Sequence, residues 1–563
     1  MSQGGAFRVT FAAALVAVVL VGVNKTAADF TFGPAVNLGP EINSSMHDAG
    51  PLIAIDDLSF LFWRITNWTG EYETWLATRE TPDEPWAAPV YLGLDEPDTF
   101  ASVIDIVPGV TTADGLELYY SSSDDLPGGH GSIDIYVMTR ETVEEEWGDL
   151  VNLGPVVNSS AQEMIPAISP DGLELYFSGY NNSNARPGGQ GGADLWMTMR
   201  DTRADPWGEP VNLGPIVNSP NNDARISISA DGLILLFDSG RPGGFGSADL
   251  YMMTRKALGE SWSDPVNLGP QVNSAQFEED GYLSPDGSIL YWDSARPGGY
   301  GGHDIWQAPV IPVVDFNGDG QVDGLELTRM ANCWGTNDPS CDIGPRAWGD
   351  GTVDAEDLKV LAAHLDSELI DYTLMAHWAL DETAGDVAHD GGAQSDGRVL
   401  GEPAWQPEGG MLCGAMACDG VDDYIETPRV VGLASGAFSV LAWVKGGAPC
   451  QTIISANNGP NWLTASMSNR QGIGGNLRTE FGGEPLTSSA CITDGQWHRI
   501  ALAWDGASRS LYVDDVLVAQ DAPGGVGQIR DRLYIGCAGD RSDGSFWSGL
   551  IDEVRIYNRA VRP

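Results

Sequence analysis

Hydrophobic positions follow different patterns in different parts of this 563-residue chain. In the first half, strand-like runs such as 173–177 (Leu-Glu-Leu-Tyr-Phe) and 288–292 (Ser-Ile-Leu-Tyr-Trp) directly follow Asp-Gly turns. After residue 372, runs of alternating apolar and polar residues are separated by glycine-rich turns. Both patterns predict short antiparallel strands. Only the segment 311–371 shows a helical period, so the expected class is mostly β with one small helical module.

A short motif recurs five times in the first part of the chain. Its best copies read Pro-Val-Asn-Leu-Gly-Pro, and its leucine stands at positions 38, 92, 153, 213 and 268, at intervals of 54, 61, 60 and 55 residues. In the last three copies a Val-Asn-Ser element, an Asp-Gly turn, an apolar strand, an Arg-Pro-Gly-Gly turn and a second strand follow in order. One small sheet per copy cannot bury both of its faces, so the copies must stack around an axis as propeller blades. We expect an N-terminal propeller of five blades, with six as the main alternative.

These repeats resemble the PD40 type of WD40-like blade, the TolB family signature of Ser-Pro-Asp-Gly followed by an apolar strand. The resemblance spans residues 29–310 and is weakest in the first copy, which lacks both the Pro-Asp-Gly and the Arg-Pro-Gly-Gly turns. It implies a PD40-type β-propeller of the kind found in bacterial envelope proteins.

The repeated charged residues of this segment have structural explanations. We expect the Asp of each Pro-Asp-Gly turn to hold local backbone N–H groups, and the repeated Arg to pack on a neighbouring blade. Catalytic carboxylates should be unique, whereas these acids recur from copy to copy, and the Ser-x-Asp-x-Gly-x-x-Trp box of sialidases is absent. The sequence therefore predicts no catalysis by the propeller.

A calcium loop is predicted at 315–326, where the sequence fits the EF-hand pattern position by position. Gly320 stands at the sharp turn, and the carbonyl of the seventh residue and a bidentate carboxylate at the twelfth complete the pattern. The candidate ligands are Asp315, Asn317, Asp319, Gln321, Asp323 and Glu326.

A second and less complete loop follows. Counting back from Asp350 places Arg346 and Trp348 where Asp and Asn are expected, and Asp342 can supply the first acid through a longer connection. The candidate ligands of this weaker site are Asp342, Asp350, Thr352, Asp354 and Asp357. The paired loops of 311–371 resemble a dockerin, which implies calcium as the cofactor and a cohesin-like docking partner.

The segment 372–563 carries an ordered set of motifs that closely resembles the LamG-like jelly roll, a concanavalin A-like antiparallel sandwich. The motifs lie at 377–382, 418–425, 438–444, 495–504, 511–514 and 549–557. The resemblance implies a calcium ion at an edge of the sandwich, because family members often hold one there. The candidate ligands are Asp390, Asp419 and Asp552.

The composition narrows the classes of partner. With 29 Lys and Arg against 79 Asp and Glu, the net charge of −50 excludes nucleic acid, which requires a positive face. Residues 1–28 have the features of a secretory signal peptide, with Arg8, the apolar run 11–23 and small residues at 26–28. The run is too short to span a bilayer, so we expect a secreted, cell-surface or periplasmic protein with no membrane insertion.

Seven cysteines are too few and too scattered for a disulfide scaffold, although export allows one to three bridges. Cys333 and Cys341 can form a local bridge, with two free thiols as the alternative. In the sandwich, Cys450–Cys491 and Cys413–Cys418 are the candidate pairs, which leaves Cys537 alone.

Taken together, these patterns favour an exported, non-catalytic, calcium-binding protein that binds an extracellular glycan or protein. Two alternatives stay open. The first is an accessory component of extracellular polysaccharide degradation, docked through the dockerin-like module. The second is a glycosidase that uses the propeller channel, which unique acids lining that channel would favour.

Overall fold

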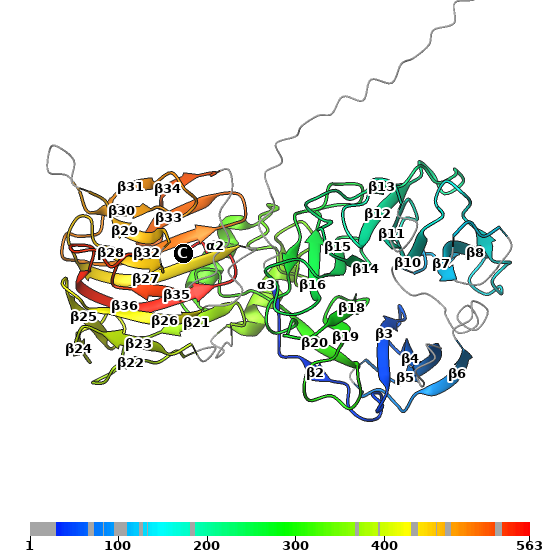
Figure 1. Cartoon of the computed structure of the whole chain (residues 1–563), viewed down its shortest axis with the longest axis horizontal. Coiled ribbons are helices and arrows are strands. Elements are labelled where there is room, and N and C mark those ends of the chain that lie inside the picture. Colours follow the sequence, from blue (N-terminus) through cyan, green and yellow to red (C-terminus); the bar gives the residue numbers. More distant parts are fainter. Residues whose placement is uncertain are drawn as a thin grey trace, which may run out of the picture.

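The computed structural model describes residues 30–65, 72–82, 84–94, 110–122, 128–131, 133–180, 186–365, 371–391, 395–429, 437–457, 459–467, 474–523 and 532–563. The signal peptide predicted at 1–28 lies outside them. The described residues form a propeller, a small helical module and a β-sandwich, in that order along the chain (Figure 1). The predicted fold class is confirmed, and the propeller has five blades.

Each of the first four blades is a small antiparallel sheet whose strands follow one another in sequence. The first blade contains β3 (His47–Ile53), β4 (Ser59–Ile65), β5 (Tyr72–Thr78) and β6 (Val90–Leu94). The second contains β7 (Glu117–Ser122), β8 (Asp134–Thr139) and β9 (Val151–Asn152). The third contains β10 (Gln162–Ile168), β11 (Glu174–Tyr180), β12 (Ala193–Met199) and β13 (Val211–Asn212). The fourth contains β14 (Asp223–Ile228), β15 (Ile234–Ser239), β16 (Asp249–Thr254) and β17 (Val266–Asn267).

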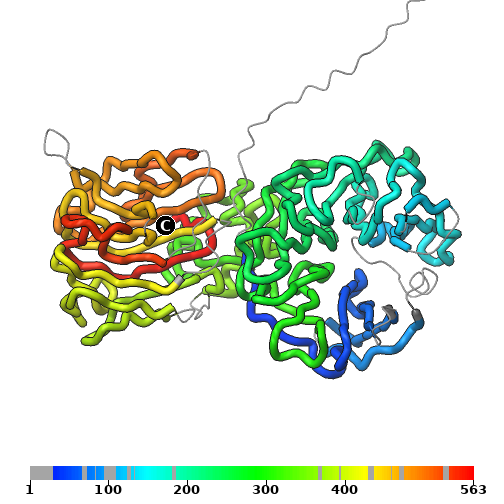
Figure 2. The backbone as a smooth tube through the Cα atoms, viewed as in Figure 1, coloured from blue at the N-terminus to red at the C-terminus, as the bar shows by residue number. Residues whose placement is uncertain are grey.

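The fifth blade closes the ring with strands from both ends of the propeller segment. β18 (Glu278–Leu283), β19 (Ile289–Ser294) and β20 (Asp304–Pro312) come from its end, and β1 (Phe30–Phe32) and β2 (Val36–Asn37) come from its beginning. Both N-terminal strands pair with β20, and Figure 2 shows the blue N-terminal segment running along the green fifth blade. The first Val-Asn-Leu-Gly copy therefore completes the last blade, as the third, fourth and fifth copies complete the blades that precede them.

The asparagine of the repeated Val-Asn-Ser element satisfies buried backbone groups. The side chain of Asn218 accepts from the N–H of Leu195 at 2.8 Å and donates to its carbonyl oxygen at 3.0 Å. Asn43, the first copy, makes the same pair of bonds to Ile305, 262 positions along the chain. Because unpaired buried backbone groups are costly, this residue recurs and in its first copy also fastens the ring.

The repeated arginine before Pro-Gly-Gly packs mainly within its own blade, so the prediction of a neighbouring blade was wrong. Arg186 pairs with Glu163 at 3.1 Å and lies over the ring of Trp196, all within the third blade. The contact between blades belongs instead to an arginine at the end of the third strand. Arg255 of the fourth blade, fully buried, pairs with Glu174 of the third at 2.6 Å.

The helical module consists of α2 (Gly324–Cys333) and α3 (Ala355–His364). Each helix begins with a capping box, in which an Asp accepts from the third backbone N–H of the helix and an acid three residues later accepts from the Asp N–H. A disulfide joins Cys333 to Cys341, which is the bridged one of the two alternatives that the sequence left open. The module core is small and apolar: Val314, Phe316, Val322, Met330, Ile343, Val353 and Leu361.

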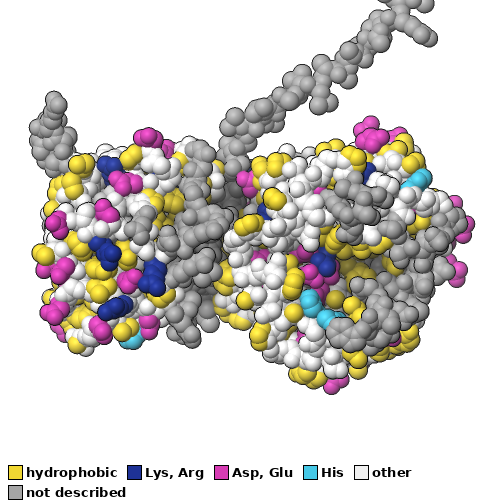
Figure 3. Space-filling model, in the orientation of Figure 1, with side chains coloured by type: hydrophobic (Ala, Val, Ile, Leu, Met, Phe, Trp, Pro, Cys, Tyr) yellow, Lys and Arg dark blue, Asp and Glu magenta, His cyan; other side chains and the backbone are white. Residues whose placement is uncertain are grey.

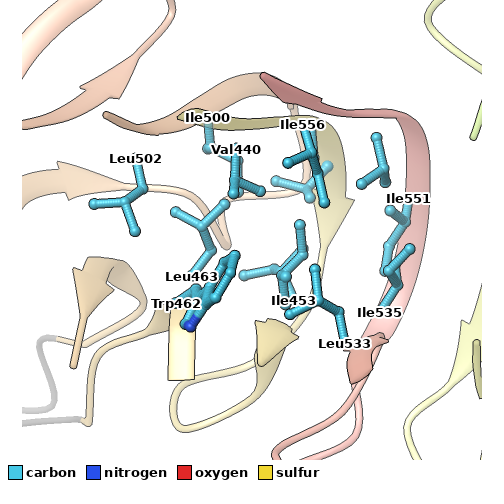
Figure 4. Packing of buried hydrophobic residues seen from close by; sticks show 14 of the residues in the cluster. Val440, Ile453, Trp462, Leu463, Ile500, Leu502, Leu533, Ile535, Ile551 and Ile556 are labelled. Carbon is cyan, nitrogen blue, oxygen red and sulfur yellow. The ribbon is translucent and has the colours of Figure 1, made fainter. Parts of the chain in front are cut away.

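The sandwich packs two eight-stranded antiparallel sheets face to face. The first sheet contains β21 (Leu374–Trp378), β24 (Ala404–Gln406), β25 (Ala415–Asp419), β27 (Phe438–Gly446), β32 (Trp497–Trp504), β33 (Arg509–Val513), β34 (Val516–Asp521) and β36 (Ser548–Tyr557). The second contains β22 (Val387–Ala388), β23 (Gly397–Leu400), β26 (Tyr424–Arg429), β28 (Thr452–Ala456), β29 (Asn461–Ala465), β30 (Asn476–Thr479), β31 (Leu486–Cys491) and β35 (Arg532–Ile535). Side chains from both sheets interdigitate in the core, as Val440 and Ile556 do with Ile453 and Trp462 (Figure 4).

The other cysteine pairs suggested by the sequence do not form in the structure: all five sandwich cysteines are free thiols. Cys450 bonds to the backbone of β29 and Cys491 pairs with β30, so two strands separate them, or roughly 14 Å at about 4.8 Å per strand. Cys418 is buried in β25, whereas Cys413 is exposed before the strand begins, and both are free thiols. Among the described residues, no helix has the length and apolar character needed to cross a membrane.

The module contacts both large domains. Its second loop docks on the propeller: Arg346 pairs with Asp231 at 3.0 Å, and the indole N–H of Trp348 donates to the same carboxylate at 2.9 Å. Its first loop docks on the sandwich, where the hydroxyl of Tyr557 donates to the carbonyl of Gly318 at 3.0 Å. The helical module is therefore the joint between propeller and sandwich.

Removal of residues 30–40 tests closure of the ring. The deletion exposes the edge of β20 and the apolar side chains beneath β1, so we expect the propeller to lose its cooperative thermal transition and to become prone to aggregation. Differential scanning calorimetry of the full chain and the deletion variant measures this. A variant that keeps an unchanged propeller transition would show that the N-terminal strands are dispensable.

Candidate functional site

The first calcium loop has its backbone wound around its own acids. Asp315, only 2% exposed, accepts from the N–H groups of Gly318 at 2.7 Å and of Gly320 at 2.9 Å. The side chain of Asn317 accepts from the N–H of Asp319, also at 2.9 Å. Gly318 and Gly320 have φ angles of 73° and 85°, which a side chain would strain. The loop is thus folded around the side chains of Asp315 and Asn317 by its own backbone N–H groups.

Glu326 is the strongest indication of a missing cation in this loop. It is 1% exposed, and its Oε2 accepts from the N–H of Asp323 at 2.9 Å. Its other carboxylate oxygen, Oε1, is buried without a hydrogen-bond partner. Burial raises the pKa of Glu326, and the charges of Asp315 and Asp319 raise it further. A buried carboxylate oxygen without a donor is what a bidentate calcium ligand presents before the ion binds.

The second loop repeats this arrangement with an insertion. Asp342 accepts from the N–H groups of Asp350 at 2.9 Å and Gly351 at 2.7 Å, as Asp315 does in the first loop. Asp357 stands where Glu326 stands, and its Oδ2 accepts from the N–H of Asp354 at 2.7 Å. The segment between the first acid and the capping Asp is four residues longer here, since 354 − 342 is 12 and 323 − 315 is 8.

This insertion explains why the second loop departs from the calcium pattern. It carries Arg346 and Trp348, the two residues that dock on the propeller. The shorter Asp357 also has both oxygens engaged, because Oδ1 accepts from the N–H groups of Ile343 and Gly344. The second loop is therefore built for domain docking. The assignment of both loops as calcium sites stays a prediction.

The three acids predicted in the sandwich engage different segments of the backbone. Asp390 accepts from the N–H groups of His377 and Ser395, at 2.8 and 2.9 Å. Asp419 lies with two further acids, Asp422 and Asp423, and one carboxylate oxygen of each is within 4.8 Å of the others.

Asp552 is completely buried in β36, and its Oδ2 accepts from the N–H groups of Met411 and Leu412 at 2.7 and 3.0 Å. Its Oδ1 has no hydrogen-bond partner. Burial raises the pKa of Asp552 to about 7, against the effect of those two N–H groups, and the nearby charges of Glu553 and Asp381 raise it as well. A cation near Oδ1 would stabilise the ionised form of this buried carboxylate. The calcium prediction for Asp552 therefore rests on a buried oxygen without a partner, and the prediction for Asp390 does not.

A pocket of about 470 Å³ opens between the inner strands of the propeller. One part of its wall is aromatic and apolar: Leu52, Trp63, Val110, Tyr119, Tyr120, Met164, Ile165, Pro166 and Tyr180. The other part is charged: Arg225, Glu279, Asp280, Asp293 and His303. Figure 3 shows acidic, basic and histidine side chains meeting in a hollow of the propeller face, with apolar side chains around them.

The charged wall is a network with too few cations. Nη1 of Arg225 lies 3.0 Å from Oε1 of Glu279 and 3.4 Å from Oδ2 of Asp238, and its Nε lies 3.6 Å from Oδ2 of Asp280. A second pair joins Nδ1 of His303 to Oδ2 of Asp293 at 2.7 Å. Four carboxylates therefore face one guanidinium and one imidazole.

Burial determines how these acids titrate. It raises the pKa of Asp293 to about 6, although the hydrogen bond from His303 opposes the change. Burial also raises the pKa of Asp238, Glu279 and Asp280, in each case against the charge of Arg225. Burial disfavours protonation of His303, but its bond to Asp293 raises its pKa overall. An added positive charge would stabilise the ionised carboxylates of this network.

The pocket acids were missed by the sequence reasoning because they occupy positions that differ between copies. Trp63, Ser121, Ser178, Asp238 and Asp293 stand at the same place in the second strand of successive blades. The acids that do recur are structural, as predicted: the carboxylate of Asp171, in a Pro-Asp-Gly turn, accepts from the N–H of Leu173. Comparison of the copies column by column would have separated the two kinds of acid.

A bulge with a left-handed residue recurs in the inner strands that form the pocket wall. The inner strands of four blades contain a register shift at the same place, and a residue there has a positive φ: Gly50, Ile165, Arg225 and Asp280. The angle is 51° for both Arg225 and Asp280. Left-handed non-glycine residues cost free energy and are concentrated at functional sites. In three of the blades the bulge places a different side chain in the pocket wall, namely Ile165, Arg225 and Asp280.

Comparison with known proteins supports the assignment of the sandwich. Residues 419–563 match the concanavalin A-like lectin/glucanases superfamily, in the family Laminin_G_3. This is about a quarter of the chain, since 563 − 419 + 1 is 145 residues of 563. The C-terminal segment is therefore a concanavalin A-like lectin/glucanase domain. A search of the curated proteins returned no match.

Solved structures resemble this chain only distantly. Domain 4 of AbnA, a GH43 extracellular arabinanase from Geobacillus stearothermophilus in complex with arabinotriose, is 22% identical, with 34% of this chain and 94% of that chain covered and a TM-score of 0.28. Trypanosoma rangeli sialidase in complex with the inhibitor DANA is 12% identical, with 95% and 96% covered and a TM-score of 0.41. These values are too low to transfer a function. The PD40 and dockerin resemblances stay predictions.

Substitution of Glu326 tests the first calcium loop. Calcium at 100 times its dissociation constant should stabilise the native chain by about 2.7 kcal/mol, and Glu326→Gln should remove most of this stabilisation, because one amide oxygen cannot replace a bidentate carboxylate. Calorimetric titration and thermal melts with and without calcium measure both effects. Glu356→Gln, at an exposed position of α3, is the control. Asp350→Asn should remove less of the calcium-dependent stabilisation than Glu326→Gln does. Equal calcium affinity in wild type and Glu326→Gln would contradict the assignment.

The pH dependence of stability tests the burial of Asp552. Its pKa is higher in the folded state than in the unfolded chain, so the folded state binds more protons and unfolding free energy falls as the pH rises from about 4 to about 7. With calcium chelated, we expect Asp552→Asn to lose less stability between pH 5 and pH 8 than wild type. Denaturant unfolding at several pH values gives the difference, with the exposed Asp540→Asn as control. A wild-type profile parallel to that of Asp552→Asn would argue against the shift.

Proposed function

We propose that this chain is an exported, non-catalytic protein that binds carbohydrate outside the cell, with calcium as a structural cofactor. The observation that carries the proposal is the propeller pocket, a cavity of about 470 Å³ whose wall contains aromatic rings, carboxylates and a guanidinium. Ligand pockets commonly have this size. The C–H face of a sugar packs on aromatic rings, and its hydroxyl groups donate to carboxylates and accept from arginine.

The other domains support the same proposal. The sandwich belongs to a superfamily described as lectins and glucanases, so it is a second candidate surface for a glycan. The disulfide between Cys333 and Cys341 is consistent with an oxidising, extracellular compartment. Calcium is abundant in such compartments, and loop 1, residues 315–326, would take it up after export.

Two alternatives follow from specific observations. Because the pocket acids differ between blades, hydrolysis of a glycoside by the propeller becomes the second candidate; Glu279 and Asp293 would be the acids to test. We rank binding above it, since both acids are already tied to Arg225 and His303. A role as an accessory component of polysaccharide degradation, docked to a cohesin-like partner, ranks third, because both loops of the module already contact this chain's own domains.

A glycan array probed with the full chain and with Trp63→Ala tests the proposal. Trp63 lines the pocket, so its loss should weaken binding of the oligosaccharides that wild type selects by about tenfold or more, as for other buried aromatic contacts. Trp334→Ala, at a half-exposed position in the module, is the control. No reducing sugar should be released from plant or algal polysaccharides. Release that is lost in Glu279→Gln would support the hydrolase alternative instead, and wild type without any array signal would contradict carbohydrate binding.

A further inference from the structure

We propose that the propeller pocket contains a transition-metal site formed by Glu279, Asp293 and His303, which binds zinc or a similar divalent ion. Glu279 lies on β18 and Asp293 on the adjacent strand β19 of the fifth blade, and His303 directly precedes the next strand, β20. One donor atom of each lies within 4.8 Å of the others. The site is separate from the calcium loops and lies in the pocket proposed above for carbohydrate, but the metal does not require a bound carbohydrate.

Strand register gives the first reason for a cation. Glu279 on β18 stands directly opposite Asp293 on β19. Like charges in a cross-strand pair are destabilising, and the equivalent pairs in the third and fourth blades are Met164 with Ser178 and Ala224 with Asp238, neither of which pairs two acids. An ion between Glu279 and Asp293 would turn this repulsion into shared coordination.

Burial gives the second reason. Asp293 is 1% exposed and Asp238, behind Arg225, is 2% exposed, so these carboxylates have little access to water or salt. Arg225 is the shared ion-pair partner of Glu279, Asp280 and Asp238. Its closest contact uses Oε1 of Glu279, which leaves the second oxygen of that carboxylate for a metal.

The donor set determines the class of metal. An imidazole nitrogen with two carboxylates suits zinc and neighbouring first-row ions, whereas calcium prefers oxygen ligands alone. Three protein ligands leave at least one coordination position open, and here it would face the pocket. His47 also lines the pocket, with its ring 5.5 Å from that of His303, and can act as a further donor.

The peptide geometry prepares these ligands. Asp280, next to Glu279, has a φ of 51° and lies at the bulge of β18, so the strand changes direction directly after Glu279. The N–H of Gly50 donates to Oδ1 of Asp293 at 3.3 Å, and the N–H of Asp48 donates to the carbonyl of His303 at 2.9 Å. The first blade therefore fixes two of the three ligands from outside, as supporting contacts do in metal sites.

Isothermal titration of the full chain with zinc chloride tests the site. The chain is first treated with chelator and then saturated with calcium, so that the oxygen-only loops are occupied. We expect one zinc ion per chain in wild type, an affinity lower by about 10-fold or more in His303→Ala and Asp293→Asn, and no change in His130→Ala, an exposed histidine of the same propeller. Zinc should also raise the melting temperature of wild type more than that of His303→Ala.

Each outcome decides the proposal. No zinc binding by wild type overturns it, and so does equal binding by wild type and His303→Ala, which would indicate adventitious surface histidines. Should Asp293→Asn fail to fold, wild type and His303→Ala still give the answer. Displacement of zinc by calcium at equal concentration would show an oxygen-type site and contradict the proposed metal class. No glycan is present, so the result is separate from the test of carbohydrate binding.

Discussion

Both candidate sites are built around carboxylates that lie inside the protein with fewer cations than they need. A buried charge is tolerated only when hydrogen-bond donors or opposite charges replace the lost water. In loop 1, backbone N–H groups satisfy Asp315, but Oε1 of Glu326 has none. In the propeller, one arginine faces three carboxylates. The folded backbone already holds both sets of ligands, so a cation is the missing component in each.

The same constraint connects the domains. The carbonyl oxygens of loop 1 are turned outward by the winding of its backbone around the acids, and the sandwich uses them: Arg559 donates to Asp315, Arg499 to Asn317 and Tyr557 to Gly318. An ion that fixes the loop therefore also fixes the surface on which the sandwich rests. In the second loop, the inserted Arg346 and Trp348 both bind the carboxylate of Asp231, which lies in a turn of the propeller. Metal binding and domain arrangement are thus coupled through one small module.

Much of this architecture could be predicted from the sequence, because repeats, turns and calcium loops are local patterns. The five-fold repeat predicts the blades, and the position of Glu326 follows from its spacing to Asp315. Closure of the ring by β1 and β2 could not be read from local patterns, because it joins residues more than 260 positions apart. The pocket acids were missed for a related reason: Glu279 and Asp280 have no acid at the equivalent positions of the third and fourth blades, so a comparison of what the copies share does not find them. The predicted partner of the repeated arginine was wrong because the sequence shows which residues are neighbours along the chain but not which ones meet across a sheet.

The central claim is that cations occupy these buried carboxylate sites. Anomalous X-ray diffraction from crystals of the full chain grown with calcium and zinc tests it most directly. The account predicts a calcium ion bound by both oxygens of Glu326 in loop 1, and a zinc peak between Glu279, Asp293 and His303 in the propeller. Well-ordered density at both places with no anomalous peak at either would contradict it.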